Sequence, residues 1–264
     1  MNAITIRDLH VSLGGVPIIE ALDLDVAQGQ WLNVIGANGA GKTTMLRAIL
    51  SLVDHRGSID IEGLAAGDRV ARARAVAYVP QSPVIPPGVS VADYVLLGRT
   101  PHRGVFGGDS ASDRAIASEA LERLDLLRLA GRDIRGLSGG ERQRAVIARG
   151  LTQQSEILVL DEPTTALDLG HQLEVLDLID ELRVERGLTV LATLHDLTLA
   201  GRFGNRLALL SCGRVETVGE PAAVLTERTI AEFFGAQVRI IDDVDGPVIV
   251  PAVARSHPRS VHDG

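Results

Sequence analysis

Alternating apolar and polar positions near the beginning of the chain predict β-strands. Leu22, Leu24 and Val26 are separated by two aspartates, which is the period-two pattern of a strand with one face in water. We therefore expect residues 3–35 to consist of strands, the last of them a short apolar run over 31–35.

A helix and two further strands are predicted next. Residues 42–52 carry apolar side chains at helical spacing, and the stretches 58–62 and 76–79 are typical of strands. Three prolines within 82–88 then interrupt regular structure. Helical spacing resumes after them, so residues 82–154 are predicted to be a helical insertion.

The second half of the chain alternates strands with helices. Residues 157–160 and 188–194 are continuous apolar runs, as expected for strands buried on both faces. Between them, residues 169–186 form a helical pattern that stops at Gly187. This alternation predicts an α/β fold in which helices cover both sides of a mainly parallel sheet.

The C-terminal region is predicted to hold one more pair of strands. Residues 236–251 form two extended segments around Asp245-Gly246, and the tail from Ala252 is polar and contains proline. We expect one main domain over residues 1–240, followed by a C-terminal strand and a loose tail over 241–264.

Composition excludes some functional classes. Apolar residues make up 45% of the chain and aromatic residues only 3%, so the core is expected to be aliphatic. The net charge of −8 argues against nucleic acid as a partner, which would need a basic surface. No window approaches the roughly 18 apolar residues of a membrane span, so a membrane role would need a partner protein. Cys212, the one cysteine, is predicted to be a structural residue near a turn.

A glycine-rich segment lies between the apolar run 31–35 and the helix predicted over 42–52. Glycines let consecutive backbone N–H groups point at phosphate oxygens, and the positive end of the helix dipole lies at the same place. We expect Lys42 to reach the β- and γ-phosphates of a nucleotide and the Thr43 hydroxyl to bind Mg²⁺. The alternative, a glycine-rich connector, fits this strand–loop–helix context poorly. The segment matches the P-loop pattern GxxxxGK[ST] and reads Gly36-Ala37-Asn38-Gly39-Ala40-Gly41-Lys42-Thr43.

Two acidic residues end the strand predicted over 157–160. Open α/β sheets bind ligands at this end of their strands. Asp161 is predicted to hold Mg²⁺ directly or through water, and Glu162 to polarise the attacking water as general base. A solvated strand end would be an equal alternative for a chain without a P-loop. Asp168 is expected to cap the helix over 169–186 and to lie in a loop that faces a partner subunit.

A second set of backbone donors is predicted where Leu-Ser-Gly-Gly-Glu-Arg-Gln-Arg opens a helix at residues 137–144. A chain with one P-loop needs only one such cradle. The turn formed by Ser138, Gly139 and Gly140 is therefore expected to face a nucleotide that another copy of the chain holds.

With these motifs the sequence resembles the ATP-binding subunits of ABC transporters over about residues 3–240. The resemblance implies a P-loop NTPase core of the RecA-like type, with an antiparallel β subdomain and an inserted α-helical subdomain. It rests on motifs that occur in the family's order: the P-loop, Gln81, residues 137–143, Leu160-Asp161-Glu162-Pro163, Ala166-Leu167-Asp168 and His195.

The resemblance also implies a head-to-tail dimer, in which each ATP lies between the P-loop of one copy and residues 138–140 of the other. Gln81 resembles a lid glutamine that contacts Mg²⁺ and senses the membrane subunits. His195 resembles a switch histidine at the γ-phosphate; a lone histidine is more often structural, but the position before Asp196-Leu197 favours the switch.

The residues expected to act in catalysis are Glu162, His195, Lys42 and Gln81. Those expected to hold the metal are Thr43, Gln81 and Asp161. Those expected to contact the nucleotide are Gly36, Ala37, Asn38, Gly39, Ala40, Gly41, Lys42, Thr43, Thr44, Ser138, Gly139, Gly140, Asp168 and Leu13.

The implied activity is ATP hydrolysis coupled to transport, with Mg²⁺ as cofactor. The implied partners are a second copy of the chain, integral membrane permease subunits and, indirectly, a substrate-binding protein. The implied location is peripheral, on the cytoplasmic face of the inner membrane. Residues 91–102, 167–172 and 195–197 resemble the ATPases of importers for iron–siderophore complexes, haem and cobalamin. His102 and His171 lack close companion ligands and are not expected to bind metal. His257 and His262 lie in the expected loose tail and are expected to be solvated.

One position departs from the family pattern. The family often places an aromatic residue in the first strand-loop to stack on adenine, and Leu13 stands at the matching place. Leucine can pack on a ring face but lacks the aromatic geometry, a difference of about 0.5–1.5 kcal/mol. We therefore expect somewhat weaker or less selective adenine binding, with activity retained.

Three other classes fit less well. An ABC ATPase of DNA repair or translation carries a long coiled-coil insertion or two cassettes per chain, and neither is found in this sequence. A P-loop kinase or GTPase would not need residues 137–143 or His195. A degenerate module without hydrolysis would not keep Glu162, Lys42 and His195 together. An ABC ATPase subunit with a different cargo stays open as an alternative.

Overall fold

The computed structural model describes residues 1–64, 68–103 and 108–252, so the expected loose tail with its two histidines lies outside the described residues. Its central sheet has six strands in the order β5-β6-β7-β3-β8-β9. The first five run parallel, and the last pairs antiparallel with its neighbour. These strands are β3 (Trp31–Ile35), β5 (Val76–Val79), β6 (Ile157–Asp161), β7 (Thr189–Thr193), β8 (Arg206–Ser211) and β9 (Arg214–Gly219).

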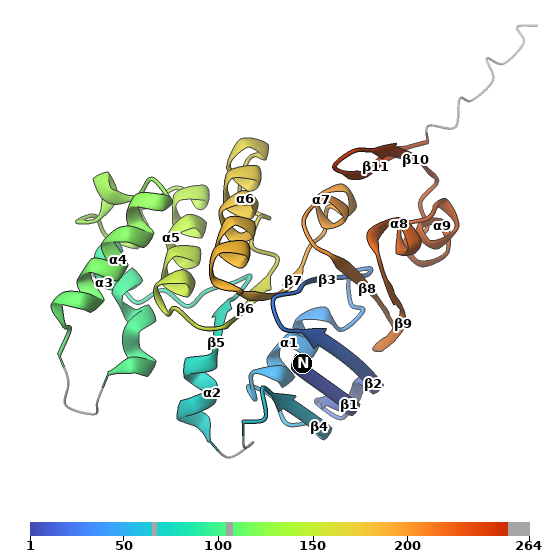
Figure 1. The fold of residues 1–264 in the computed structure, drawn as a ribbon, viewed down its shortest axis with the longest axis horizontal. Coiled ribbons are helices and arrows are strands. Elements are labelled where there is room, and N and C mark those ends of the chain that lie inside the picture. Colours follow the sequence, from blue (N-terminus) through green and yellow to red (C-terminus); the bar gives the residue numbers. More distant parts are fainter. Residues whose placement is uncertain (65–67, 104–107, 253–264) are drawn as a thin grey trace, which may run out of the picture.

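A separate antiparallel sheet of three strands lies beside the P-loop helix (Figure 1). It consists of β1 (Asn2–Leu13), β2 (Val16–Ala27) and β4 (Arg56–Ile61), with β1 in the middle. Leu22, Leu24 and Val26 of β2 are buried against α1 (Lys42–Ile49) and the central sheet, as their alternation predicts. The helix α1 ends earlier than the predicted residue 52, and Ser51 just beyond it has a left-handed φ of 56°.

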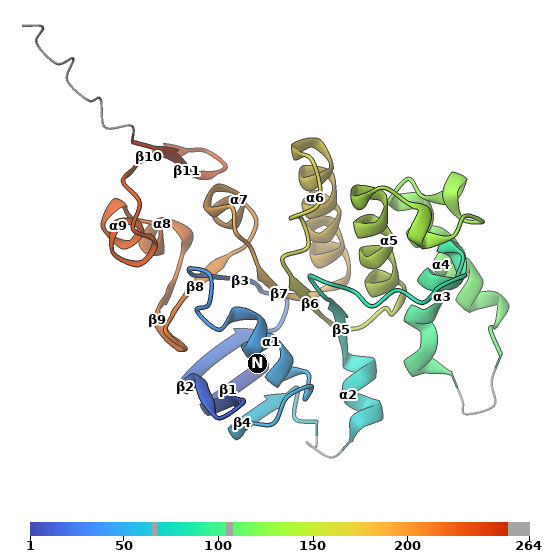
Figure 2. The ribbon, with the colours of Figure 1, turned by 180° about the vertical axis from the view of Figure 1, so that it is seen from behind.

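Helices fill the chain between β5 and β6. Figures 1 and 2 show them at the end of the molecule next to β5. Both α4 and α5 begin with a capping box, made by Ser110 with Asp113 and by Ser138 with Glu141. These elements are α3 (Val91–Leu96), α4 (Ala111–Arg123) and α5 (Gly139–Thr152), with short 3₁₀ turns η1 (Leu97–His102), η2 (Leu127–Leu129) and η3 (Ile134–Gly136).

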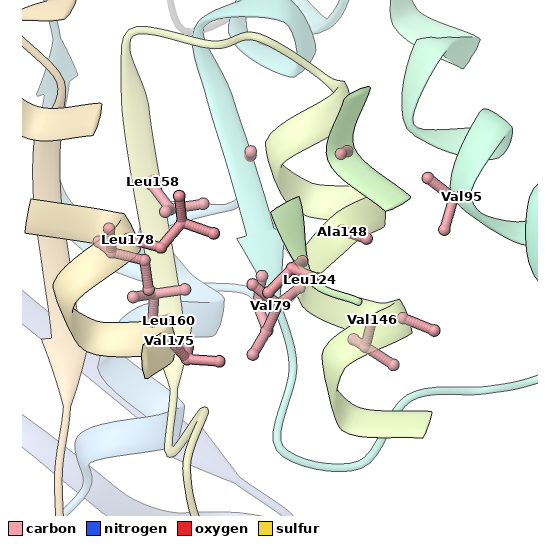
Figure 3. Close-up of a cluster of buried hydrophobic side chains, with 14 of the residues drawn as sticks. Val79, Val95, Leu124, Val146, Ala148, Leu158, Leu160, Val175 and Leu178 are labelled. Carbon is pink, nitrogen blue, oxygen red and sulfur yellow. The ribbon is translucent and has the colours of Figure 1, made fainter. Parts of the chain in front are cut away.

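The insertion shares its core with the sheet. Figure 3 shows Val79 of β5 and Leu158 of β6 in one apolar cluster with Val146 of α5 and Val175 of α6 (Leu169–Arg186). All four side chains are at most 1% exposed. Because close-packed interiors transmit displacement, the helices and the sheet are mechanically connected through this cluster. The expected fold class, a P-loop core with an antiparallel subdomain and a helical insertion, is confirmed.

The C-terminal quarter adds short helices and a hairpin. The helices are α7 (Leu197–Arg202), α8 (Pro221–Val224) and α9 (Glu227–Phe234), and the hairpin is β10 (Val238–Asp243) with β11 (Gly246–Pro251). The expected strand pair around Asp245-Gly246 is therefore present, and the expected boundary after residue 240 falls inside β10. The structure also contains α2 (Arg69–Ala75), a helix that the sequence pattern did not predict. Within the three described ranges, no helix has both the length and the apolar composition needed to cross a membrane.

Candidate functional site

The P-loop joins β3 to α1 and passes close to other backbone. Gly36 has a φ of 154°, and a Cβ there would lie 2.2 Å from the Leu210 carbonyl oxygen of β8. Gly41 has a φ of 105°, and a Cβ there would lie 2.7 Å from Ile19 Cδ1 of β2. Both positions therefore require glycine, one for space and both for conformation. The loop is held in its curled shape by the central sheet on one side and the antiparallel sheet on the other.

Lys42, the first residue of α1, points back over this loop. Its Nζ donates to the carbonyl oxygens of Gly36 at 2.7 Å and Ala37 at 3.2 Å. Burial lowers the pKa of Lys42, while the carboxylates of Glu162 and Asp161 act in the opposite direction. The ammonium is thus held at the loop by neutral oxygens, which a phosphate oxygen can replace with a stronger, charged partner.

Asp161, at the end of β6, is the centre of a set of oxygen atoms. Its Oδ1 accepts hydrogen bonds from Thr43 Oγ1 at 3.1 Å and from Thr193 Oγ1 at 2.9 Å. Its Oδ2 accepts from the Tyr78 hydroxyl at 3.4 Å. Burial, and secondly the Asp161 charge, raise the pKa of Tyr78 to about 12, so the phenol stays a donor. Sequence reasoning missed Thr193 and Tyr78, whose strands become neighbours of β6 only in the folded sheet.

These oxygen atoms fit Mg²⁺. One carboxylate and one hydroxyl are hard ligands, and Mg²⁺ commonly takes only one or two protein oxygens, with waters and phosphate oxygens completing the octahedron. Within the described ranges, no group of three or more His, Cys, Asp or Glu residues forms a metal cage of its own. Asp161 and Thr43 are thus suited to a metal that arrives with a phosphate.

Glu162 follows Asp161 in a strained, left-handed conformation with a φ of 51°. Its N–H donates to Thr193 Oγ1 at 3.0 Å and to the Thr193 carbonyl oxygen at 3.2 Å. Its carboxylate accepts a hydrogen bond from Gln81 Nε2 and lies 2.5 Å from His195 Nε2. Three residues from separate loops, predicted individually from the sequence, therefore meet at one carboxylate. The Glu162 side chain is 7% exposed and that of His195 is 42% exposed, so the histidine forms the open edge of the cluster.

An open cavity of about 500 Å³ lies over the P-loop. Its wall contains P-loop residues from Asn38 to Thr44, together with Ile18, Gln81, Glu162 and His195. Ile18 of β2 was missed by sequence reasoning, because only the fold brings that strand over the loop. Leu13, the expected adenine contact, lies at the end of β1 with 41% of its surface exposed and is not part of this wall.

The second donor turn lies elsewhere in the chain. Ser138 is the N-cap of α5, where its Oγ accepts from Glu141 N at 3.3 Å. Asp168 caps α6 as expected, accepting from His171 N at 3.0 Å. The α-carbon of Gly140 faces Leu167, so this turn packs against the loop before α6. Among the described residues that surround the P-loop cavity, none belongs to residues 138–140 or is Asp168. In a single chain, the backbone donors of residues 138–140 therefore do not line the cavity that the P-loop donors line.

Comparison with known proteins agrees with this geometry. The chain matches the family model for "ABC transporter" over residues 19–165. It is 38% identical over 246 residues to the iron(3+)-hydroxamate import ATP-binding protein FhuC of Bacillus subtilis (strain 168), covering 92% of this chain and 91% of that protein. Its fold is similar to that of a metal-chelate type ABC transporter in an inward-facing conformation, with a TM-score of 0.81, 30% identity and coverage of 96% and 98% of the two chains. A dimeric ATP-binding cassette in a post-hydrolysis state, bound to ADP and Pi, is similar with a TM-score of 0.75, 28% identity and coverage of 83% and 98%.

The cavity over the P-loop includes Glu162, which follows β6, and the same chain carries a second donor turn. This arrangement agrees with the family match over more than half of the sequence. The chain belongs to the ABC transporter family, and it is an ATP-hydrolysing, ATP-binding subunit of that family.

Proposed function

We propose that this chain powers the import of an iron complex (a siderophore or haem) or of cobalamin through a membrane permease, by hydrolysing ATP at the interface of a head-to-tail dimer. The observation that carries the proposal is the separation of the two donor sets. The cavity over the P-loop collects Lys42, Glu162 and His195 but not the turn at residues 138–140. A second copy supplies that turn and closes the cavity.

The residues of the cavity have different roles in phosphoryl transfer to water. The P-loop N–H groups and Lys42 bind the β- and γ-phosphates and stabilise the charge that spreads over the γ-phosphate oxygens. Asp161 and Thr43 would hold Mg²⁺, which would supply further charge neutralisation at the phosphates. Glu162 accepts the proton of the attacking water. Gln81 and His195 each contact a different oxygen of that carboxylate, which restricts its orientation.

Dimer closure couples this chemistry to motion. The N–H groups at the start of α5 and the Ser138 hydroxyl bind the γ-phosphate of the other copy's ATP. The closed dimer binds ATP more tightly than the open one does, and loss of the γ-phosphate removes that difference. The helical insertion that carries this turn shares its apolar core with the sheet, so it transmits closure toward the membrane partner.

The cargo assignment rests on relatives and on local sequence. FhuC is named for import of iron(3+) hydroxamate, and the structural relative is of the metal-chelate type. Residues 91–102 of this chain, which form α3 and η1, carry the stretch that resembles importers of iron–siderophore complexes, haem and cobalamin. We place the protein peripherally on the cytoplasmic face of the inner membrane, with a substrate-binding protein on the far side of its permease.

We propose that the permease binds in a groove of about 540 Å³ between α1, α2 and η1. Its lining includes Leu52, which is 61% exposed, and the cations Arg69 and Arg72, and no acidic residue is among its described lining residues. Arg72 is 9% exposed; its Nη2 donates to the Ile49 carbonyl oxygen at 3.2 Å, but its buried Nη1 has no partner among the described residues. A carboxylate within an apolar segment of the permease satisfies that donor.

Two variants test these proposals. Glu162→Gln should retain ATP binding, lose turnover and accumulate as an ATP-bound dimer in size-exclusion chromatography, and cells carrying it should lose uptake of radiolabelled iron complexes or cobalamin. Hydrolysis at a near-normal rate would exclude Glu162 as the base. Arg72→Met should keep the basal ATPase rate of the purified chain and lose its stimulation by permease in proteoliposomes. Equal stimulation of variant and wild type would move the permease contact to another surface.

A further inference from the structure

The short helix α7 begins two residues after His195, the histidine that contacts Glu162. Its N-cap is Asp196, whose carboxylate accepts from Leu199 N at 3.0 Å, and His195 is the residue before that cap. Any shift of α7 along or across its axis therefore moves His195 relative to Glu162. A helix of 6 residues has little stability of its own, so its position depends on what packs against it.

One side of α7 is fastened to the strand that leads into the P-loop. Asn33 of β3 is fully buried, and its Nδ2 donates to the Ala200 carbonyl oxygen at 2.9 Å and also to that of Phe203. Its Oδ1 accepts from Trp31 Nε1 at 2.8 Å, and the Trp31 ring lies 6.0 Å from the Phe203 ring between centroids. A buried amide with its donors and acceptor all occupied holds the C-terminal end of α7 in one place.

The other side of α7 is covered by the C-terminal hairpin, which lies directly over it in Figures 1 and 2. Thr198 Oγ1 accepts a hydrogen bond from the backbone N–H of Ile249 in β11 at 3.1 Å. Arg202 forms an ion pair of 2.8 Å with Asp245 in the hairpin turn. A Cβ on Gly201 would lie 3.0 Å from Pro247 Cγ, so helix and hairpin are in close contact between these two bonds.

From these contacts we infer that the β10–β11 hairpin is a positioning element of the γ-phosphate site. It presses α7 against Asn33 and so sets where His195 stands beside Glu162. A displacement of the hairpin, which lies at the surface, changes the rate of hydrolysis without changing the P-loop that binds the nucleotide. The inference rests on the role proposed for His195, and Thr198 is in this view a positioning residue.

The test compares full-length variants at Thr198 and Gly201. Thr198→Val removes the acceptor for Ile249 N–H at nearly constant volume, and Thr198→Ser keeps it. Gly201→Val adds an isopropyl group, whose Cβ alone would lie 3.0 Å from Pro247 Cγ. We expect kcat for ATP hydrolysis to fall about fivefold or more in Thr198→Val and Gly201→Val, with KM for ATP within about twofold of wild type, as for an interaction expressed in the transition state. Thr198→Ser should retain the wild-type kcat.

Trp31 is the one tryptophan of the chain and packs on Phe203 at the end of α7, so its fluorescence reports on this helix. We expect its emission to change in the two slow variants while their melting temperatures show a folded chain. If Gly201→Val does not fold, the valine and serine variants of Thr198 carry the test alone. A wild-type kcat in Thr198→Val, or equal slowing in Thr198→Ser, overturns the role of the hairpin. Full turnover in His195→Ala would instead overturn the proposed function of that histidine.

Discussion

Thr193 at the end of β7 is the residue whose loss should reveal most about how this site is organised. Its side chain is fully buried, and Thr193 pairs with Asp161, the last residue of the neighbouring strand β6. Its hydroxyl donates to Asp161 Oδ1 at 2.9 Å and accepts from Glu162 N at 3.0 Å. Thr193→Val removes both hydrogen bonds while keeping nearly the same shape.

The size of the effect follows from what each bond joins. A hydrogen bond to a charged group contributes about 1.5–3 kcal/mol, and the Asp161 carboxylate loses one such donor. Glu162 N–H keeps the Thr193 carbonyl oxygen at 3.2 Å as an acceptor, so removing its bond to the hydroxyl costs less free energy. If about 2 kcal/mol of the lost hydrogen bonding raises the activation free energy of hydrolysis, kcat should fall about 30-fold.

Phosphate release at saturating Mg-ATP measures this rate, with Thr193→Ser as the matched control. Serine keeps the hydroxyl and removes only a methyl group, so we expect it to melt at a lower temperature but to retain most of its kcat. A thermal melt of Thr193→Val checks that the chain is folded. The reasoning is refuted if the valine variant hydrolyses ATP at the wild-type rate, or if the serine variant slows as much as valine does.

Three further predictions concern binding and stability. Lys42→Ala should weaken nucleotide binding itself, about tenfold or more in a fluorescent-ATP titration, because the phosphates lose a charged partner; unchanged affinity would contradict the P-loop assignment. Leu13→Tyr should tighten ATP binding by about 0.5–1.5 kcal/mol in calorimetry if this position contacts adenine, and equal affinity of variant and wild type would exclude such a contact. The hydrogen bond from Arg99, followed by those from Ser110, holds the pKa of Asp113 well below its ordinary value. Its contribution to folding is therefore present above about pH 4 and is lost as pH falls through the folded-state pKa. Asp113→Asn should lower the free energy of unfolding in urea at neutral pH, and its difference from wild type should shrink under acid; a constant difference would refute this.

Local sequence patterns were sufficient for the parts of the site that are contiguous in the chain. The P-loop is one unbroken segment between a strand and a helix, so its conformation follows from its glycines and its flanking elements. The helix over 169–186 begins after Asp168 and stops at Gly187 as predicted, because capping and termination depend on residues only a few positions apart. The roles of Gln81 and His195 came from resemblance, since neither residue carries a local signal of its chemistry.

Which residues surround these groups depends on how the strands pair in the folded sheet. Thr43 and Asp161 are 118 positions apart, and they meet because β3 and β6 both flank β7 in the central sheet. Periodicity shows which face of a strand is buried but contains no information about which strand lies beside it. For that reason Thr193 and Ile18, and the hairpin over α7, could not be placed from the sequence. Motifs and resemblance were enough to identify the family, the fold class and the P-loop, acidic and histidine residues of the site, whereas the order of strands in the sheet sets which side chains surround them.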